Sequence, residues 1–246
     1  MSPSSVAIVG GNRLAEDLLR LALDKGLNAA RCAGPDAVDP ATEVVVDTLA
    51  HGSEEKRRLV EAIDAAAPGA ALVLSSCIRW SATTLASWSR RPERIVGFAT
   101  FHPLARRNVI ELARGLDTGD EAMAAAGALV EGLGKESAVV KDAPGLVFPR
   151  ILSLIINEAA RSLDEGVATA EEIDVALRLG TNYPQGPLRW ADEVGLDEVL
   201  AVLEGLLEET GDDRYRPAPL LRKMVASGRL GESVGRGFYR HGETGI

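Results

Sequence analysis

The stretch Val6–Asp17, VAIVGGNRLAED, joins an apolar run, a glycine turn and the start of a helical pattern. The run Val6–Val9 is apolar throughout, as in a strand that is buried on both faces of a sheet. It ends at Gly10 and Gly11, after which leucines recur at helical spacing as far as Gly26, a residue suited to ending a helix. A buried strand that leads through a glycine turn into a helix is typical of a parallel α/β sheet.

The same alternation continues along the first part of the chain. Strands are expected at Leu27–Cys32, Glu43–Leu49, Ala70–Ser75, Arg94–Ala99 and Ile110–Ala113, with Val139 and Val140 closing this part. Helices are expected at Glu54–Ala67 and Thr83–Arg90, and from a capping-box spacing at Thr118–Glu121 to about Leu133. Continuous apolar strands that alternate with helices predict a Rossmann-type, mostly parallel sheet with helices on both faces.

The pattern changes after Ala143-Pro144-Gly145, beyond which only helices are expected. They lie at Leu146–Glu165, from the capping-box spacing at Thr169–Glu172 to Leu179, and at Pro187–Glu193, Leu196–Glu209 and Ala218–Ser227. The sequence therefore predicts an α/β dinucleotide-binding-like domain over residues 1–143, followed by an all-α domain over residues 144–246.

Composition narrows the possible partners and the compartment. The net charge of −9 argues against nucleic acid or an anionic membrane surface, because both require a basic face. No apolar run reaches the length of a membrane span, and the first residues lack the features of a signal peptide. Cys32 and Cys77 are isolated from each other and from other metal ligands, so we expect no metal site and a location in the reducing cytoplasm.

The stretch Arg94–Glu111, RIVGFATFHPLARRNVIE, resembles the active-site strand of the 3-hydroxyacyl-CoA dehydrogenases. In that family the sequence motif is close to G-L-H-F-F-N-P, with a catalytic Glu twelve residues after the His. Gly97, Phe101, Pro103 and Glu111 keep this register, while Ala99 occupies the position of the His.

The resemblance extends from about Val6 to Tyr239. Similar pieces recur in the same order in the second half, at Asn157–Ala159, Gly186–Pro187, Asp192, Gly195–Asp197 and Gly235–Tyr239. It implies that the first domain binds NAD, that the helical domain forms a homodimer interface, and that the active site lies between them. The implied activity is the oxidation of a 3-hydroxyacyl-CoA to a 3-ketoacyl-CoA.

The dinucleotide loop departs from the usual glycine pattern. Gly10 takes the first glycine position, Asn12 the second and Ala15 the third. With the resemblance, the residues expected to border the cofactor are Gly10, Gly11, Asn12, Leu14, Ala15, Lys56, Ser75 and Ser76. For Lys56, an exposed charge on an amphipathic helix is an equally good interpretation.

The acidic residue that would bind the ribose of NAD falls near Ala33, and the nearby Asp36 lies beyond a Gly-Pro break. Arg31 would suit a 2′-phosphate, although a lone arginine is more often a solvated surface charge. NADP therefore stays open beside NAD.

Three of the four catalytic positions that the resemblance implies carry different side chains. The His, Ser and Asn positions are Ala99, Ile78 and Pro149, so that only Glu111 is retained. A positioned acid or base typically contributes about 10²- to 10⁴-fold to a rate. His102 could replace the base, but its odd offset from Ala99 places it on the opposite face of an extended strand.

The substrate clamp of the family is also expected to be absent. Only ten residues separate Cys32 from Glu43, too few for a full crossover helix. In the family, as the resemblance implies, a longer segment here includes a helical hairpin that helps to hold coenzyme A.

Three hypotheses follow for function. The chain is an NAD-dependent 3-hydroxyacyl-CoA dehydrogenase, a catalytically lapsed homologue that serves as a binding or partner subunit, or a dehydrogenase of a smaller hydroxy acid that uses His102 or His51 as its base. The first two imply a small-molecule or acyl-CoA ligand and a homodimer.

Overall fold

The computed structural model describes residues 5–67, 69 and 72–242. The chain divides into two compact units, Met1–Val147 and Phe148–Ile246. Within the described residues, no helix has the length and apolar character that a membrane span requires.

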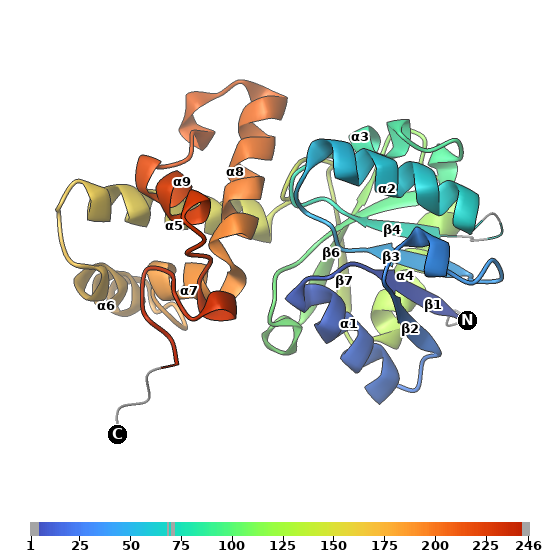
Figure 1. The fold of residues 1–246 in the computed structure, drawn as a ribbon, viewed down its shortest axis with the longest axis horizontal. Helices are drawn as coiled ribbons and strands as arrows, with labels where there is room; N and C mark the ends of the chain where they lie inside the picture. The colour runs from blue at the N-terminus through green and yellow to red at the C-terminus, as the bar shows by residue number, and fades with distance from the viewer. Residues whose placement is uncertain (1–4, 68, 70–71, 243–246) are drawn as a thin grey trace. The chain divides into compact units, whose positions relative to one another are not determined.

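The first unit is built on a seven-stranded sheet with the order β2-β1-β3-β4-β5-β6-β7 (Figure 1). The strands are β1 (Val6–Val9), β2 (Ala29–Cys32), β3 (Val44–Asp47), β4 (Leu72–Ser76), β5 (Ile95–Ala99), β6 (Val109–Arg114) and β7 (Glu136–Val140). All neighbouring pairs are parallel except β5 and β6. This confirms the predicted Rossmann-type, mostly parallel sheet. Ala70 and Ala71 of the predicted fourth strand lie outside the described residues.

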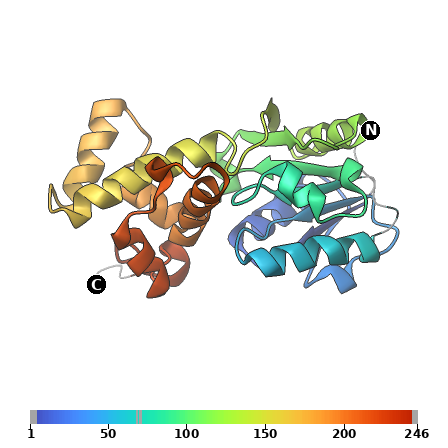
Figure 2. The same cartoon turned by 90° about the horizontal axis from the view of Figure 1, so that it is seen from above.

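Helices cover both faces of this sheet (Figure 2). On one face, α1 (Arg13–Asp24) and α4 (Asp120–Gly132) pack onto a core that includes Ile8, Leu74 and Phe98. On the other face lie α2 (Ser53–Ala66), whose Lys56 bonds to Asp47 at the end of β3, and α3 (Ala82–Ser87), which packs on β5. Because side chains alternate along a strand, each strand residue is assigned to one of these two faces.

The predicted capping box at Thr118 is wrong. Gly119 caps α4 without a side-chain hydrogen bond. The Thr118 hydroxyl instead donates to the carbonyl of Ile95 at 2.7 Å and accepts from the amide of Gly115 at 2.9 Å. The spacing predicted that the Thr118 hydroxyl would cap the helix, but it bonds instead to a buried carbonyl at the start of β5.

The connection from β2 to β3 contains no α-helix. Residues 33–43 pass from one side of β1 to the other with only the short 3-10 helix η1 (Pro35–Ala37), which packs against α2. Within the described part of the chain, β2 therefore forms the edge of the sheet.

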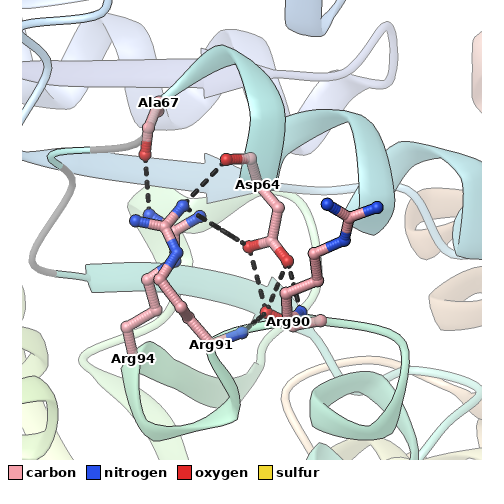
Figure 3. A network of polar contacts seen from close by, with 6 residues as sticks. Asp64, Ala67, Arg90, Arg91 and Arg94 are labelled. Atoms are coloured by element: carbon pink, nitrogen blue, oxygen red, sulfur yellow. Dashed lines mark hydrogen bonds and ion pairs between the residues drawn. The ribbon is translucent and has the colours of Figure 1, made fainter.

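A buried ion pair ties the end of α2 to the loop before β5 (Figure 3). Arg94 donates to the Asp64 carboxylate at 2.6 Å and to the Ala67 carbonyl at 2.7 Å. Asp64 also accepts from the hydroxyl of Ser89 and from the amide of Arg90. Burial by itself raises the pKa of Asp64, but these hydrogen bonds outweigh it and hold the pKa below its ordinary value.

The second unit is helical. It contains α5 (Phe148–Asp164), α6 (Ala170–Thr181), α7 (Pro187–Val194), α8 (Leu196–Thr210) and α9 (Pro219–Ala226). The capping box predicted at Thr169 is confirmed, because Thr169 and Glu172 bond reciprocally.

Two buried carboxylates tie the C-terminal segment of this unit to its helices. Asp192 of α7 accepts from the amides of Phe238 and Tyr239 and pairs with His241. Asp174 of α6 accepts from the Tyr239 hydroxyl at 2.8 Å.

Candidate functional site

The glycine turn after β1 is shaped by contacts with the end of β3. Gly10 has a φ of 150°, and a Cβ at this position would lie 2.0 Å from the Thr48 hydroxyl oxygen, so only glycine fits. Asn12 caps α1, and its side-chain oxygen accepts from the Ala15 amide at 3.1 Å and from the Thr48 hydroxyl at 2.8 Å. Its side-chain nitrogen donates to the Thr48 carbonyl at 2.9 Å. The Asn12 side chain therefore stabilises the turn, which would consist of backbone alone if a glycine occupied this position.

A cavity of about 650 Å³ lies beside this turn. Its walls are formed by Val9, Gly10, Gly11, Arg31, Ala33, Gly34, Pro35, Leu49, Glu55, Arg58, Leu59 and Ala62. The cavity adjoins the carboxyl ends of β1, β2 and β3, the edge at which open α/β sheets bind their ligands. A Cβ at Gly11 would meet no atom within 4 Å, so the backbone there is open to an approaching group.

Lys56 and Ser75 are fully buried and do not line the cavity. Lys56 Nζ lies 2.5 Å from Asp47 Oδ2 and 2.8 Å from the Leu49 carbonyl oxygen, and the Ser75 hydroxyl donates to the same Asp47 oxygen at 2.6 Å. The Trp80 ring centroid lies 5.8 Å from Lys56 Nζ, within cation–π range. The interpretation of Lys56 as an exposed surface charge is therefore wrong. The lysine belongs to a buried group that ties α2 to the ends of β3 and β4.

Ser76 lies on the other face of the sheet. It pairs in register with Phe98, whose side chain belongs to the core under α1 and α4. The Ser76 hydroxyl is buried and has no hydrogen-bond partner within the described part of the chain. Residues predicted to border a single cofactor are therefore divided between two faces of the sheet.

Ala99 and Glu111 face each other across β5 and β6. They are paired in register, so both side chains lie on the face covered by α2 and α3. The buried Glu111 carboxylate accepts from the Val147 amide at 2.8 Å. The structure thus places the methyl group of Ala99 beside the carboxylate with which the family's histidine is associated. Ile78 and Pro149 are also buried, and neither side chain can donate a hydrogen bond.

His102 lies on the opposite side of the sheet from Ala99. Its Nδ1 atom is 2.7 Å from Asp17 Oδ2 in α1, and the same carboxylate oxygen accepts from the Leu104 amide at 2.8 Å. These contacts hold the imidazole against α1, away from the face that carries Ala99 and Glu111. His51 lies in the turn that precedes α2.

Sequence reasoning did not identify Asp17, Asp47 or Thr48 as part of these networks. The sequence feature that could have revealed a network is the polar pair Asp47-Thr48 at the end of an otherwise apolar strand. A charge buried at such a position requires a partner. No group of three or more metal-binding side chains occurs among residues 5–67, 69 and 72–242.

Comparison with known proteins agrees with this architecture. Residues 22–143 match the model of the 3-hydroxyacyl-CoA dehydrogenase NAD-binding domain, and residues 145–241 match that of the C-terminal domain. A probable 3-hydroxybutyryl-CoA dehydrogenase of Bacillus subtilis is 38% identical over 201 residues, which are 82% of this chain and 70% of the relative. The 3-hydroxybutyryl-CoA dehydrogenase of Bradyrhizobium diazoefficiens is 36% identical over 240 residues, which are 96% of this chain and 82% of the relative.

A solved structure is similar over nearly the whole chain. The (S)-3-hydroxybutyryl-CoA dehydrogenase of Ralstonia eutropha superimposes with a TM-score of 0.82 and 33% identity, covering 98% of this chain and 100% of the other. Together with the two family models, these matches show that the chain belongs to the 3-hydroxyacyl-CoA dehydrogenase family and carries its NAD-binding domain.

Proposed function

We propose that the chain binds a nicotinamide dinucleotide at the carboxyl edge of its sheet and oxidises a 3-hydroxyacyl-CoA to a 3-ketoacyl-CoA. The observation that carries this proposal is the match of both family domains over nearly the whole chain. In this proposal, residues 1–143 form the dinucleotide-binding domain, and residues 144–246 form the domain for dimerisation and substrate.

The residues around the glycine turn fit the adenosine and pyrophosphate part of such a cofactor. Gly10 and Gly11 border the cavity, and the space at Gly11 allows close approach to the backbone. Asn12, Leu14 and Ala15 form the turn and the start of α1 behind it. Lys56, Ser75 and Ser76 are buried, so we propose that they support the strands beside the site and do not contact the cofactor. The bound cofactor would supply a hydride acceptor.

The proton of the substrate hydroxyl has no side-chain acceptor at Ala99. Glu111 is the retained carboxylate on this face, and it is engaged by the Val147 amide. A turnover without a positioned base should be slower by about 10²- to 10⁴-fold than one with it. We therefore expect a weak dehydrogenase.

A second candidate function is a lapsed homologue that binds ligands without turnover. It is favoured by one observation, the pairing of Ala99 with Glu111. The carboxylate that orients the base in the family here holds the backbone at Val147 instead. This function predicts dinucleotide binding with no reduction of the cofactor.

Restoring the missing base separates the two functions. NADH and NADPH formation from 3-hydroxyacyl-CoAs of several chain lengths should be measured for the wild type, Ala99→His and Glu111→Gln. If the chain is a weak dehydrogenase, Ala99→His raises kcat/KM by about 10²- to 10⁴-fold, and Glu111→Gln lowers the activity. Ala105→His, at an exposed alanine in the same segment, is the matched control and should change nothing.

Dinucleotide binding should be measured on the same proteins, because it shows which of the two functions an absence of turnover supports. Binding without any turnover, in the wild type and in a folded Ala99→His, supports the lapsed homologue. Absence of binding in a folded wild type contradicts both functions.

We also propose that the chain forms a homodimer through its helical unit. Exposed apolar side chains on its helices support this, namely Ile151 on α5 and Val175 and Leu179 on α6. Burial of such side chains against a second copy would be favourable by about 25 cal/mol per Å² of apolar surface.

A further inference from the structure

We infer that the cavity beside the glycine turn selects a dinucleotide that carries a 2′-phosphate on its adenosine ribose, and therefore prefers NADP(H) to NAD(H). This rests on the proposed dinucleotide site. The first observation is the residue at the end of β2. Ala33, directly after Cys32, lines the cavity where a carboxylate would bind the ribose 2′-hydroxyl. Such a carboxylate would repel a 2′-phosphate, and its absence removes that repulsion.

Arg31 places a positive charge at the same wall of the cavity. Its Nε atom donates to the Gly10 carbonyl at 3.0 Å, which anchors the guanidinium at the glycine turn. One terminal nitrogen lies 3.3 Å from Glu16, and the Arg31 side chain is 37% exposed. The guanidinium is thus accessible from solvent and fixed at one end.

Arg58 adds a second guanidinium from α2. It lines the same cavity, and its Nε atom lies 3.1 Å from the exposed carboxylate of Glu54. Exposed ion pairs of this kind contribute little to stability. A phosphate dianion, which binds arginine in a bidentate manner, can therefore replace the glutamate partners of Arg31 and Arg58 at small cost.

Glu55 is the one carboxylate among the residues that line the cavity. A Cβ at Gly52 would lie 1.7 Å from Glu55 Oε2, so this carboxylate folds back over the N-terminus of α2. The partial positive charge of the helix start favours it there. The carboxylate that pairs with Arg31 at the end of β2 is thus the exposed Glu16, which does not line the cavity.

A phosphate on an adenosine ribose also occurs at the 3′ position in coenzyme A. We assign the 2′ form because the cavity includes Gly10 and Gly11, the turn that approaches the pyrophosphate of a dinucleotide. Binding of 2′,5′-ADP and of 3′,5′-ADP distinguishes the two sources.

The test is calorimetric titration of the whole protein with NADP⁺, NAD⁺, 2′,5′-ADP, 3′,5′-ADP and 5′-AMP. We expect NADP⁺ to bind at least about tenfold more tightly than NAD⁺, because a charge-assisted pair contributes about 1.5–3 kcal/mol, or roughly 10- to 100-fold. Arg58→Met should lower the affinity for NADP⁺ and 2′,5′-ADP by about tenfold or more and leave that for NAD⁺ unchanged. Ala33→Asp should reverse the preference.

Arg57→Met is the matched control. Arg57 precedes Arg58 in α2, its exposed side chain pairs with Glu61, and it does not line the cavity. It should alter neither affinity.

Each other result overturns the inference in a recognisable way. Tighter binding of NAD⁺, or an unchanged preference in both Arg58→Met and Arg31→Met, contradicts it while the proposed function stands. Tighter binding of 3′,5′-ADP than of 2′,5′-ADP assigns the cavity to coenzyme A. If a folded protein binds none of the five ligands, both the inference and the proposed function fail.

Discussion

Lys56 is the residue whose surroundings differ most from its local sequence. It stands in a charged run of a helix, SEEKRR, yet its side chain is fully buried against Asp47 and the ring of Trp80. A buried charge is tolerated only when it is paired and hydrogen-bonded, and here both partners are supplied by other elements. The lysine acts on the site indirectly, by holding the carboxyl ends of β3 and β4.

Removing the lysine should leave Asp47 as an uncompensated buried charge. We expect Lys56→Met to lower the free energy of unfolding by about 3–5 kcal/mol, measured by guanidinium denaturation. The double variant Lys56→Met/Asp47→Leu should recover much of this loss. Arg57→Met, which removes an exposed charge from the adjacent position, should stay within about 0.5 kcal/mol of the wild type. A Lys56→Met protein of wild-type stability would contradict the buried pair.

The Asp64–Arg94 pair makes the free energy of unfolding depend on pH in the acid range. Because the pKa of Asp64 is held below its ordinary value of 3.8, the unfolded chain binds this proton more readily than the folded protein. The contribution is complete above that value and is lost as the pH falls through the lower folded pKa. Urea denaturation between pH 3 and 6 should show a steeper loss for the wild type than for Asp64→Asn. Asp36→Asn, an exposed control, should keep the wild-type slope.

At the scale of elements, α3 can lie on β5 only because Gly97 has no side chain. A Cβ there would lie 2.3 Å from Cys77 Sγ and 2.8 Å from the Ala82 Cβ atom. The glycine therefore sets the close approach of the helix to the strand that ends at Ala99.

Two glycine substitutions should change stability in opposite directions. Gly97→Ala should destabilise the protein by about 1–3 kcal/mol, because the packed helix cannot move away freely. Gly127→Ala, inside α4 and with no atom within 4 Å of the new Cβ, should stabilise it by about 1 kcal/mol. Thermal or denaturant unfolding of both variants checks the sign, and a stabilising Gly97→Ala would contradict this packing.

At the scale of the whole molecule, the chain consists of an α/β unit and a helical unit that each bury their own core. The exposed apolar side chains of α6 are then available to a second copy. Leu179 is 69% exposed at the end of this helix, and Val175 lies one turn before it.

Sedimentation equilibrium tests the proposed dimer. The wild type should sediment as a dimer, and Val175→Glu/Leu179→Glu should shift it towards the monomer, because the new charges would be buried in the interface. Leu116→Glu, at an 87% exposed leucine of the α/β unit, should leave the dimer intact. A monomeric wild type, or a dimer that only Leu116→Glu disrupts, contradicts the proposal.

The sequence by itself determined the alternation of strands and helices and the change to helices alone, because these follow from patterns within short windows. It also gave the twelve-residue spacing from Ala99 to Glu111, but their pairing across β5 and β6 came only from the structure. The confirmed capping box at Thr169 and the wrong one at Thr118 show the limit of such patterns. Both have the same spacing, but the Thr118 hydroxyl donates to a carbonyl of another element, whereas Thr169 bonds reciprocally with Glu172.

Only the tertiary structure decided which hydrogen-bond partners the polar side chains of the site have. Asn12 bonds to Thr48 and Glu111 to Val147, each across 36 residues, and His102 bonds to Asp17 across 85. No local pattern encodes such pairs, since each exists only when the sheet brings its strand ends together and burial makes an unpaired polar group costly.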